Sequence, residues 1–154
     1  MAHYFLDSSG LVKRYVNETG SSWVQSLCAP DAGNTIYISR ITGAEVIAAI
    51  FRRLRMGDLR PEDAQTVARR FKGDFGRAYR VIEVTAKVVE RAMGLAEARA
   101  LRGYDAVQLA TALELHRLRQ ETSLPLLTFV SADGDLNEAA EAEGLLTDNP
   151  MAHP

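Results

Sequence analysis

The amino-acid sequence predicts an α/β domain built on a mostly parallel sheet of four to five strands. Short apolar runs rich in β-branched and aromatic residues alternate with longer segments whose apolar residues recur at helical spacing. This alternation is typical of a sheet covered by helices. The length of 154 residues, 47% of them apolar and 25% charged, is ordinary for one folded domain and excludes a disordered chain.

Four segments are expected to form strands, because each is a short apolar run that suits a sheet buried on both faces. Two of them end at a polar residue, Asp7 in the first case and Ser39 in the second. The predicted strands are residues 4–6, 36–38, 79–84 and 126–130.

Helices are expected wherever apolar residues repeat with a helical period. Gly57 is expected to end the helix at residues 42–56, and Pro61 to open the helix at residues 61–75. The segment 106–119 is apolar for most of its first ten positions, which predicts a helix buried against the sheet. The predicted helices are residues 21–28, 42–56, 61–75, 86–101, 106–119 and 136–143.

The sequence shows no repeat or linker, so we expect one domain over residues 1–146 and a frayed tail over residues 147–154. No apolar run approaches the roughly 20 residues of a membrane span. The first residues lack a basic region followed by a long apolar stretch, so no signal peptide is expected. The single cysteine, Cys28, cannot form an internal disulfide, and we expect a cytoplasmic protein.

The formal net charge of −2 argues against a general nucleic-acid coating protein. The charge is unevenly distributed, however. Residues 50–80 carry 9 basic and 4 acidic side chains, whereas residues 81–154 carry 6 basic and 12 acidic ones. The basic segment is either a pair of solvated helix faces or a surface that docks a polyanion.

Four acidic residues fall where the carboxyl ends of the predicted strands should meet. Asp7 directly follows the first strand, and Asp133 lies three residues beyond Val130 in the fourth. Glu45 lies in the first turn of the helix after the second strand, and Asp105 opens the buried helix. Because ligands of parallel α/β folds gather beyond these strand ends, we expect the four carboxylates to converge there.

Each acid taken alone has a simpler explanation. Asp7, Asp105 and Asp133 could each cap a turn or a helix, and Glu45 could form a capping box with Thr42. The group is harder to explain, since two carboxylates about 4 Å apart repel by roughly 4 kcal/mol at an effective dielectric of 20. A cation or raised pKa values would relieve this repulsion. An all-oxygen site favours Mg²⁺ or Mn²⁺.

Four stretches of the sequence resemble the PIN domain family, and above all the VapC-type toxins of bacterial and archaeal toxin–antitoxin systems. The resemblance runs from Tyr4 to Leu145, and it implies a three-layer α/β/α fold. It is most specific around Asp7 and Asp105. The four stretches are FLDSSGLVK at residues 5–13, SRITGAE at residues 39–45, LRGYDAVQLA at residues 101–110 and FVSAD at residues 129–133.

The resemblance implies a Mg²⁺-dependent endoribonuclease toxin, with Mn²⁺ expected to substitute for magnesium. Its catalytic and metal-binding residues would be Asp7, Glu45, Asp105 and Asp133. Auxiliary candidates beside them are Ser8, Ser39, Ser131 and Asp135. The sequence leaves open whether these hydroxyls only cap turns, and whether Asp133 or Asp135 faces the metal. Gly43, a poor helix residue, departs slightly from the family pattern.

The implied reaction is hydrolysis of an RNA phosphodiester by metal-activated water. Three aspartates would hold the metal and Glu45 would orient the water, with one-metal and two-metal versions both open. The rival interpretation is a non-catalytic PIN-like module that binds RNA or supports assembly. The presence of all four acids favours catalysis. Other chemistries lack support in the sequence, because it contains neither a Gly-rich phosphate loop nor a histidine beside a nucleophile.

The resemblance also implies two kinds of protein partner. A small VapB-like antitoxin is expected to inhibit the protein by placing an Arg or Lys among the acids, since guanidinium and ammonium donors match carboxylates. A homodimer is expected through the helices at residues 42–56 and 61–75. These helices carry apolar residues that either stay partly unburied on two lone helices or pack on each other within one chain: Ile50, Phe51, Leu54 and Phe71.

Overall fold

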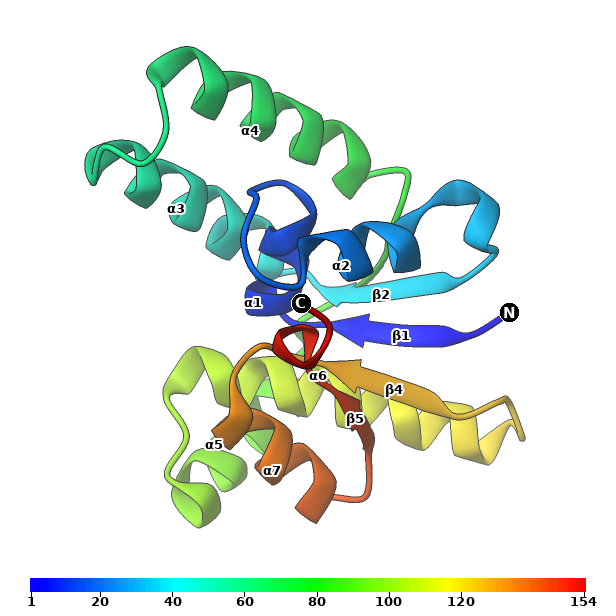
Figure 1. Cartoon of the computed structure of the whole chain (residues 1–154). Helices are drawn as coiled ribbons and strands as arrows, with labels where there is room; N and C mark the ends of the chain where they lie inside the picture. Colours follow the sequence, from blue (N-terminus) through cyan, green and yellow to red (C-terminus); the bar gives the residue numbers. More distant parts are fainter.

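A computed structural model describes residues 1–154 and confirms the predicted α/β architecture (Figure 1). All neighbouring strands are parallel, in the order β3-β2-β1-β4-β5. The strands are β1 His3–Leu6, β2 Thr35–Ser39, β3 Arg80–Ile82, β4 Leu127–Val130 and β5 Leu146–Asp148. The α-helices are α1 Ser8–Leu11, α2 Ser21–Cys28, α3 Thr42–Arg55, α4 Pro61–Phe75, α5 Ala86–Arg99, α6 Gly103–Glu121 and α7 Gly134–Ala142. Three short 3-10 helices are η1 Val12–Arg14, η2 Pro30–Ala32 and η3 Pro150–Ala152.

The helices form two layers, with α1 to α4 on one face of the sheet and α5 to α7 on the other (Figure 1). Consecutive side chains of a strand point to opposite faces, so β1 contributes to both layers. Leu6 belongs to the apolar cluster that includes Ile50 of α3 and Phe71 of α4. Phe5 stacks on Phe129 of β4, with ring centroids 5.8 Å apart, in the other cluster. The three-layer expectation is therefore confirmed.

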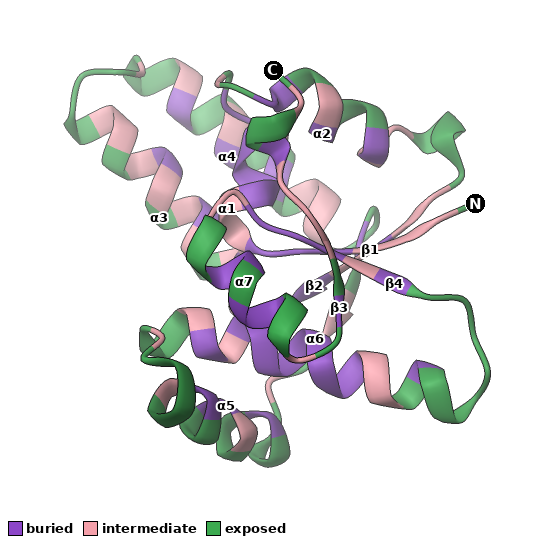
Figure 2. Ribbon diagram, turned by 60° about the horizontal axis from the view of Figure 1, so that its bottom comes forward, coloured by how far each residue is buried: buried purple, intermediate pink, exposed green.

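The central position of β1 determines where the polar residues gather. Leu6 pairs with Val130 in the parallel register, and the backbone N–H of Asp7 donates to the carbonyl of Val130 at 3.1 Å. Strands β1, β2 and β4 therefore end at the same edge of the sheet. Helix α6 begins at this edge, runs along the sheet toward the opposite edge and is buried along most of its middle (Figure 2).

The structure differs from the predicted elements mainly where an element is short. Helix α1 has only four residues and was not expected, and α6 begins at Gly103 rather than at residue 106. Strand β3 is limited to three residues within the predicted 79–84. None of the helices is long and apolar enough to pass through a bilayer.

The C-terminal segment departs from the expectation of a frayed tail over residues 147–154. Leu146 to Asp148 form β5, which pairs with β4. The following turn packs against α2, where the His153 ring stacks on Trp23 with centroids 4.1 Å apart. Gly20 lies against Pro150 and has a φ of +87°, and a Cβ there would be 2.4 Å from the Pro150 carbonyl oxygen. These contacts give the last residues a defined place in the fold.

The apolar residues on which the homodimer expectation depended are largely used within one chain. Ile50 and Phe71 are 0% and 1% exposed, and Phe51 and Leu54 are half-buried against the same cluster. The homodimer therefore stays a prediction of the family resemblance, without the support of an unburied apolar stripe.

Gly43 has a packing reason for its place near the start of α3. A Cβ at this position would lie 3.2 Å from two atoms of the Phe75 ring at the end of α4. The absence of a side chain therefore lets the end of α4 approach the first turn of α3.

Candidate active site

The four predicted acids line one pocket at the carboxyl edge of the sheet, as the sequence predicts. We call the pocket lined by Asp7, Glu45, Asp105 and Asp133 the acidic pocket. Its remaining lining residues are Ser8, Ser9, Val12, Ala49, Arg52, Arg102 and Tyr104. The acids come from four different elements of the chain, so only the folded sheet brings them together.

Asp7 is the most buried of the four acids, at 2% exposed. It caps α1: its Oδ1 accepts hydrogen bonds of 2.8 Å from both the Ser9 hydroxyl and the Gly10 backbone N–H. Its Oδ2 accepts a bond of 2.7 Å from the Ser131 hydroxyl. A carboxylate offers about four acceptor positions. Three of them are occupied, and the capping role expected as an alternative coexists with a place in the pocket.

The pKa of Asp7 is raised to about 6: burial is the main cause and the nearby Asp105 carboxylate adds to it, against the lowering effect of its three hydrogen bonds. The charged form is thus disfavoured at the end of β1. A cation beside Asp7 would stabilise that charge.

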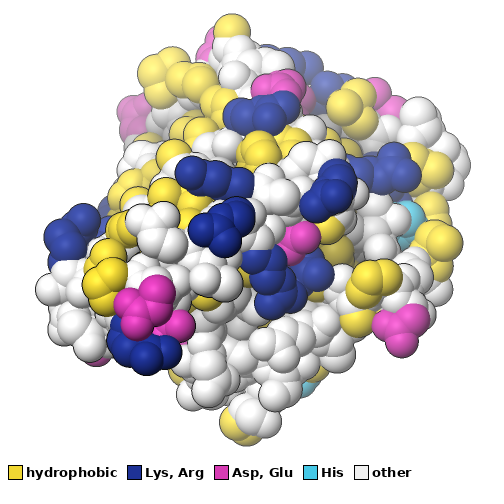
Figure 3. Space-filling view, turned by 90° about the horizontal axis from the view of Figure 1, so that it is seen from above, with side chains coloured by type: hydrophobic (Ala, Val, Ile, Leu, Met, Phe, Trp, Pro, Cys, Tyr) yellow, Lys and Arg dark blue, Asp and Glu magenta, His cyan; other side chains and the backbone are white.

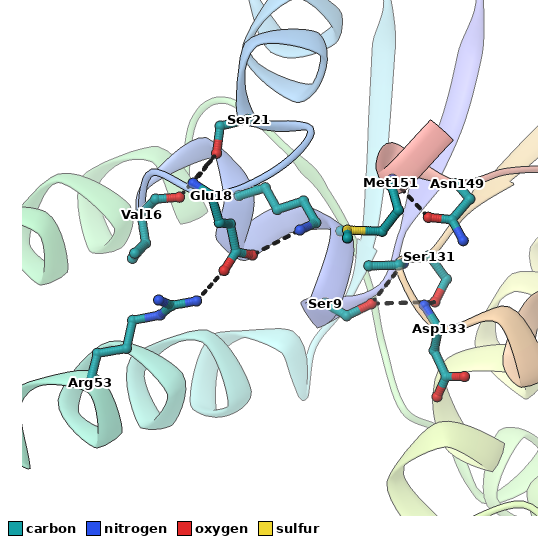
Figure 4. Close-up of polar contacts among 12 residues, drawn as sticks. Ser9, Val16, Glu18, Ser21, Arg53, Ser131, Asp133, Asn149 and Met151 are labelled. Atoms are coloured by element: carbon teal, nitrogen blue, oxygen red, sulfur yellow. Dashed lines mark hydrogen bonds and ion pairs between the residues drawn. The ribbon is translucent and has the colours of Figure 1, made fainter. Parts of the chain in front are cut away.

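Ser9 and Ser131 connect β1 to the loop after β4. The Ser9 hydroxyl lies 3.3 Å from that of Ser131 and accepts a 3.0 Å hydrogen bond from the backbone N–H of Ala132. The Ser131 hydroxyl also accepts from the backbone N–H of Asp133 at 3.1 Å. Figure 4 shows Ser9 and Ser131 side by side above Asp133. Asp7 and Asp133 are therefore linked through hydroxyl groups.

Glu45 does not form the capping box considered from the sequence. The structure shows no side-chain cap at the start of α3. Instead, Nε2 of Gln108 donates to Oε1 of Glu45 at 2.7 Å and to Oγ1 of Thr42 at 2.9 Å. Burial raises the pKa of Glu45, as does Asp105, whereas the bonds from Gln108 and Ser8 lower it.

Asp105 and Asp133 face the same arginine. Nε of Arg102 donates to Oδ2 of Asp105 at 3.1 Å, and its Nη2 lies 3.8 Å from Oδ2 of Asp133. Asp105 is not the N-cap of α6 but lies in its first turn. Burial raises the pKa of Asp105, which Arg102 opposes and Asp133 reinforces. Asp133 caps α7 through Oδ1, which accepts from the backbone N–H groups of Asp135 and Leu136.

The donor chemistry of the acidic pocket fits a hard divalent cation. All of its ligand candidates are carboxylates, three of which have raised pKa values, and Mg²⁺ prefers oxygen donors with room for water. As the side chains stand, no three acids, histidines or cysteines form a ready-made metal cluster. Arg102 lies where Asp105 and Asp133 approach each other.

The auxiliary candidates divide into two groups. Ser8 lines the pocket and lowers the pKa of Glu45, and Ser131 donates to Asp7. Ser39 is buried and does not line the pocket; its hydroxyl lies 3.4 Å from that of Thr111 on α6. Asp135 is exposed beside α5, away from the acids, so Asp133 is the residue that faces the pocket.

Sequence reasoning missed three polar residues of the site. Gln108 lies three positions after Asp105, a spacing that places both on one face of a helix. Ser9 stands in the turn that Asp7 caps. Arg102 precedes α6 as an exposed charge, and nothing in the sequence pattern distinguishes it from other surface arginines.

The basic segment 50–80 lies on the surface of α3 and α4. Figure 3 shows Lys and Arg side chains gathered on the face that carries α2 and α4. Arg53 is the half-buried exception, because it pairs with Glu18, which also accepts from Lys13 at 3.0 Å (Figure 4). The exposed members are Arg52, Arg55, Arg60, Arg69, Arg70, Lys72, Arg77 and Arg80.

The parallel sheet and the acids at its carboxyl edge define a domain of the PIN class. The sequence matches the PIN domain family over residues 4–142, and the chain belongs to that family. Among curated proteins it is similar to Ribonuclease VapC49 of Mycobacterium tuberculosis, at 40% identity over 109 residues, which are 71% of this chain and 74% of that protein.

Solved structures show the same fold at lower identity. One is the structure of VapBC2 from Rickettsia felis bound to a DNA fragment from the VapBC2 promoter. It has a TM-score of 0.60 at 20% identity, covering 96% of this chain and 98% of that one. Mycobacterium tuberculosis VapC20, described as a sarcin–ricin loop cleaving toxin, has a TM-score of 0.61 at 18% identity, covering 93% of this chain and 96% of that one.

Proposed function

We propose that this protein is a Mg²⁺-dependent endoribonuclease and the toxin of a toxin–antitoxin pair. The observation that carries the proposal is the convergence of four carboxylates from separate elements in one pocket of a PIN domain. The similarity to a protein named Ribonuclease VapC supports RNA as the substrate. An RNA substrate and the single thiol, Cys28, fit action in the cytoplasm.

In the proposed site, Asp7, Asp105 and Asp133 would hold the metal and Glu45 would orient the attacking water. The chemistry that Mg²⁺ would supply there is a lowered pKa of bound water and neutralisation of negative charge on the phosphate. The chain itself keeps each carboxylate in place. Ser9, Gly10 and Ser131 fix Asp7, and Gln108 fixes Glu45. Precise positioning matters, because small displacements of catalytic groups lower rates strongly.

A VapB-like antitoxin is the proposed inhibitor, since one of the solved structures that shares the fold is a VapBC pair. The pocket already accepts a guanidinium, that of Arg102, which supports binding of a basic side chain from a partner. The exposed basic side chains on α3 and α4 offer contacts for RNA phosphates or for acidic groups of the partner.

The alternative is a PIN-like module that binds RNA or supports assembly without cleaving. Retention of all four acids, each placed in the pocket, favours the catalytic function.

Cleavage of structured RNA by the purified protein tests the proposal. We expect Mg²⁺-dependent cleavage that EDTA abolishes and that Asp7→Asn reduces by at least about a hundredfold, since the variant loses a buried charged ligand. Asp135→Asn is the matched control, because Asp135 is an exposed aspartate outside the pocket. RNA binding without cleavage by the wild-type protein in Mg²⁺ or Mn²⁺ would instead support the non-catalytic module.

A further inference from the structure

We propose that Arg102 is the resident counter-cation of the acidic pocket, and that a divalent metal ion must displace its guanidinium from Asp105 and Asp133 in order to bind. The inference deepens the proposed function and rests on it. It assigns a role to a residue of this chain that lines the pocket but belongs to none of its acids.

The geometry shows that Arg102 and a metal ion would compete for the same atoms. Oδ1 of Asp133 is engaged in capping α7, where it accepts from two backbone N–H groups. Its Oδ2 is the oxygen left for a ligand, and this is the atom that faces Nη2 of Arg102 at 3.8 Å. Asp105 likewise presents Oδ2 to Nε of Arg102 at 3.1 Å.

Arg102 is placed so that it can leave without disturbing the fold. Its side chain is 66% exposed, and it stands just before α6 with an extended backbone. The guanidinium lies 5.0 Å from the centroid of the Tyr104 ring, an exposed cation–π contact. An exposed ion pair contributes little stability, so displacement costs the domain little.

The position of Arg102 explains why such a cation helps when no metal is bound. Asp105, in the first turn of α6, and Asp133, the N-cap of α7, both direct Oδ2 at its guanidinium, at 3.1 and 3.8 Å. A positive charge between two neighbouring carboxylates offsets their repulsion. A divalent ion does the same with a higher charge and takes over this task when it binds.

Arg52 provides a matched comparison within the same pocket. It also lines the pocket and is exposed, but it forms no ion pair with any of the acids. Neutralising Arg52 removes the same unit of charge from the rim, and it leaves the oxygens of Asp105 and Asp133 as they were. The difference between the two arginines thus isolates direct competition from a general change in charge.

The test measures Mn²⁺ binding to the metal-free protein in the absence of RNA. Binding is monitored through the electron paramagnetic resonance signal of free Mn²⁺ and by calorimetry. We expect Arg102→Gln to tighten binding about fivefold, the factor that corresponds to losing one competing exposed ion pair. Arg52→Gln should tighten it by less than about twofold, because its charge acts only through solvent. Thermal melting in EDTA verifies that both variants are folded.

The outcomes separate this inference from the proposed function. Equal Mn²⁺ affinities of Arg102→Gln and Arg52→Gln, or weaker binding by Arg102→Gln than by wild type, overturn the role of Arg102 while the metal site stands. Failure of the wild-type protein to bind Mn²⁺ at millimolar concentration overturns the metal site and the inference together. Tighter binding by Arg102→Gln alone supports the inference.

Discussion

Nε2 of Gln108 donates to Oε1 of Glu45 at 2.7 Å and thereby links the second turn of α6 to the first turn of α3. Gln108 is 1% exposed, and its second hydrogen bond goes to Thr42 in the same turn. Its own Oε1 has no partner. A neutral donor thus fixes an acid of the pocket that no backbone group holds.

This contact predicts that Gln108→Met, which keeps the bulk but loses the donor, lowers RNA cleavage by about tenfold, since partners that orient a site residue are typically worth this much. Without the donor, the pKa of Glu45 rises further, so the acid limb of the pH–rate profile moves upward. Gln120→Met on the exposed face of α6 is the control. An unchanged pH–rate profile in Gln108→Met would show that Glu45 is positioned by other means.

The pKa of Asp7, raised to about 6 from an ordinary value of 3.8, predicts a pH dependence of stability. The folded protein holds the proton more tightly than the unfolded chain, so the stabilisation is present at low pH and is lost as the pH rises through about 6. In EDTA, the free energy of unfolding should fall by about 1 kcal/mol more between pH 5 and pH 7 in wild type than in Asp7→Asn. Urea denaturation at both pH values measures this difference.

Metal binding should show the opposite dependence, because a metal ligand must be deprotonated. Mn²⁺ should raise the melting temperature of the wild-type protein at pH 7 and do so less at pH 5. At a Mn²⁺ concentration of 100 times Kd, binding at a single site adds about 2.7 kcal/mol to the free energy of unfolding. Asp105→Asn should remove most of that gain, and Asp135→Asn should keep it. A melting temperature of the wild-type protein that does not change in millimolar Mn²⁺ would contradict the metal site.

Glu114 predicts a purely structural effect away from the pocket. It is 8% exposed and pairs with Arg91 at 2.8 Å, Arg117 at 3.1 Å and Lys87 at 3.7 Å, so it joins α5 to α6. Although burial opposes it, these cations lower the pKa of Glu114. Glu114→Gln should therefore cost about 1–2 kcal/mol at pH 7, a figure reduced for the exposure of its partners.

The lowered pKa sets the pH window of that cost. The stabilisation from Glu114 is present above its unfolded pKa and is lost as the pH falls through its folded pKa, so the gap between wild type and Glu114→Gln should narrow as the pH falls below the ordinary value of 4.5. Glu121→Gln is the control, since Glu121 forms an exposed pair with Arg117 and should change stability by less than about 0.5 kcal/mol. A gap that does not narrow with falling pH would mean that shape rather than charge is responsible.

The C-terminal turn predicts a sharp difference between two glycines. Gly20 and Gly33 both have positive φ, but a Cβ at Gly20 meets Pro150, whereas a Cβ at Gly33 meets nothing within 4 Å. Gly33→Ala should cost about 1 kcal/mol for the backbone conformation alone. Gly20→Ala should cost about 2–4 kcal/mol, because the turn after β5 must move as well. Equal costs in urea denaturation would show that the last residues do not pack on α2 in solution.

The sequence was most informative where a physical pattern extends over many residues. Alternating apolar runs and helical periodicity predicted four of the five strands and six of the seven α-helices, and strand ends pointed to the four acids. Strand β5 and helix α1 were missed because three or four residues carry too little periodic signal. Ser39 ends its strand as predicted, yet its side chain faces α6 rather than the pocket.

The contacts within the site could not be predicted from the sequence for a different reason. Asp133 and Asp135 are the same residue type, and only the cap geometry of α7 turns Asp133 toward the pocket and leaves Asp135 in solvent. The role of Arg102 depends on the distance between two helices far apart in the chain. The spacing of Gln108 from Asp105, by contrast, was readable and could have been used.

The central place of β1 has a consequence for the time at which a newly made chain could become active. Strand β1, which precedes Asp7, is synthesised before both of its neighbours; β4 is the later of the two, and Ser131 beyond β4 binds the Asp7 carboxylate. At about 5–20 residues per second, the ribosome adds the Ser131 hydroxyl on the order of ten seconds after Asp7. The pocket therefore cannot assemble on a nascent chain until the segment from β4 to Asp133 has been translated, well after Asp7 itself.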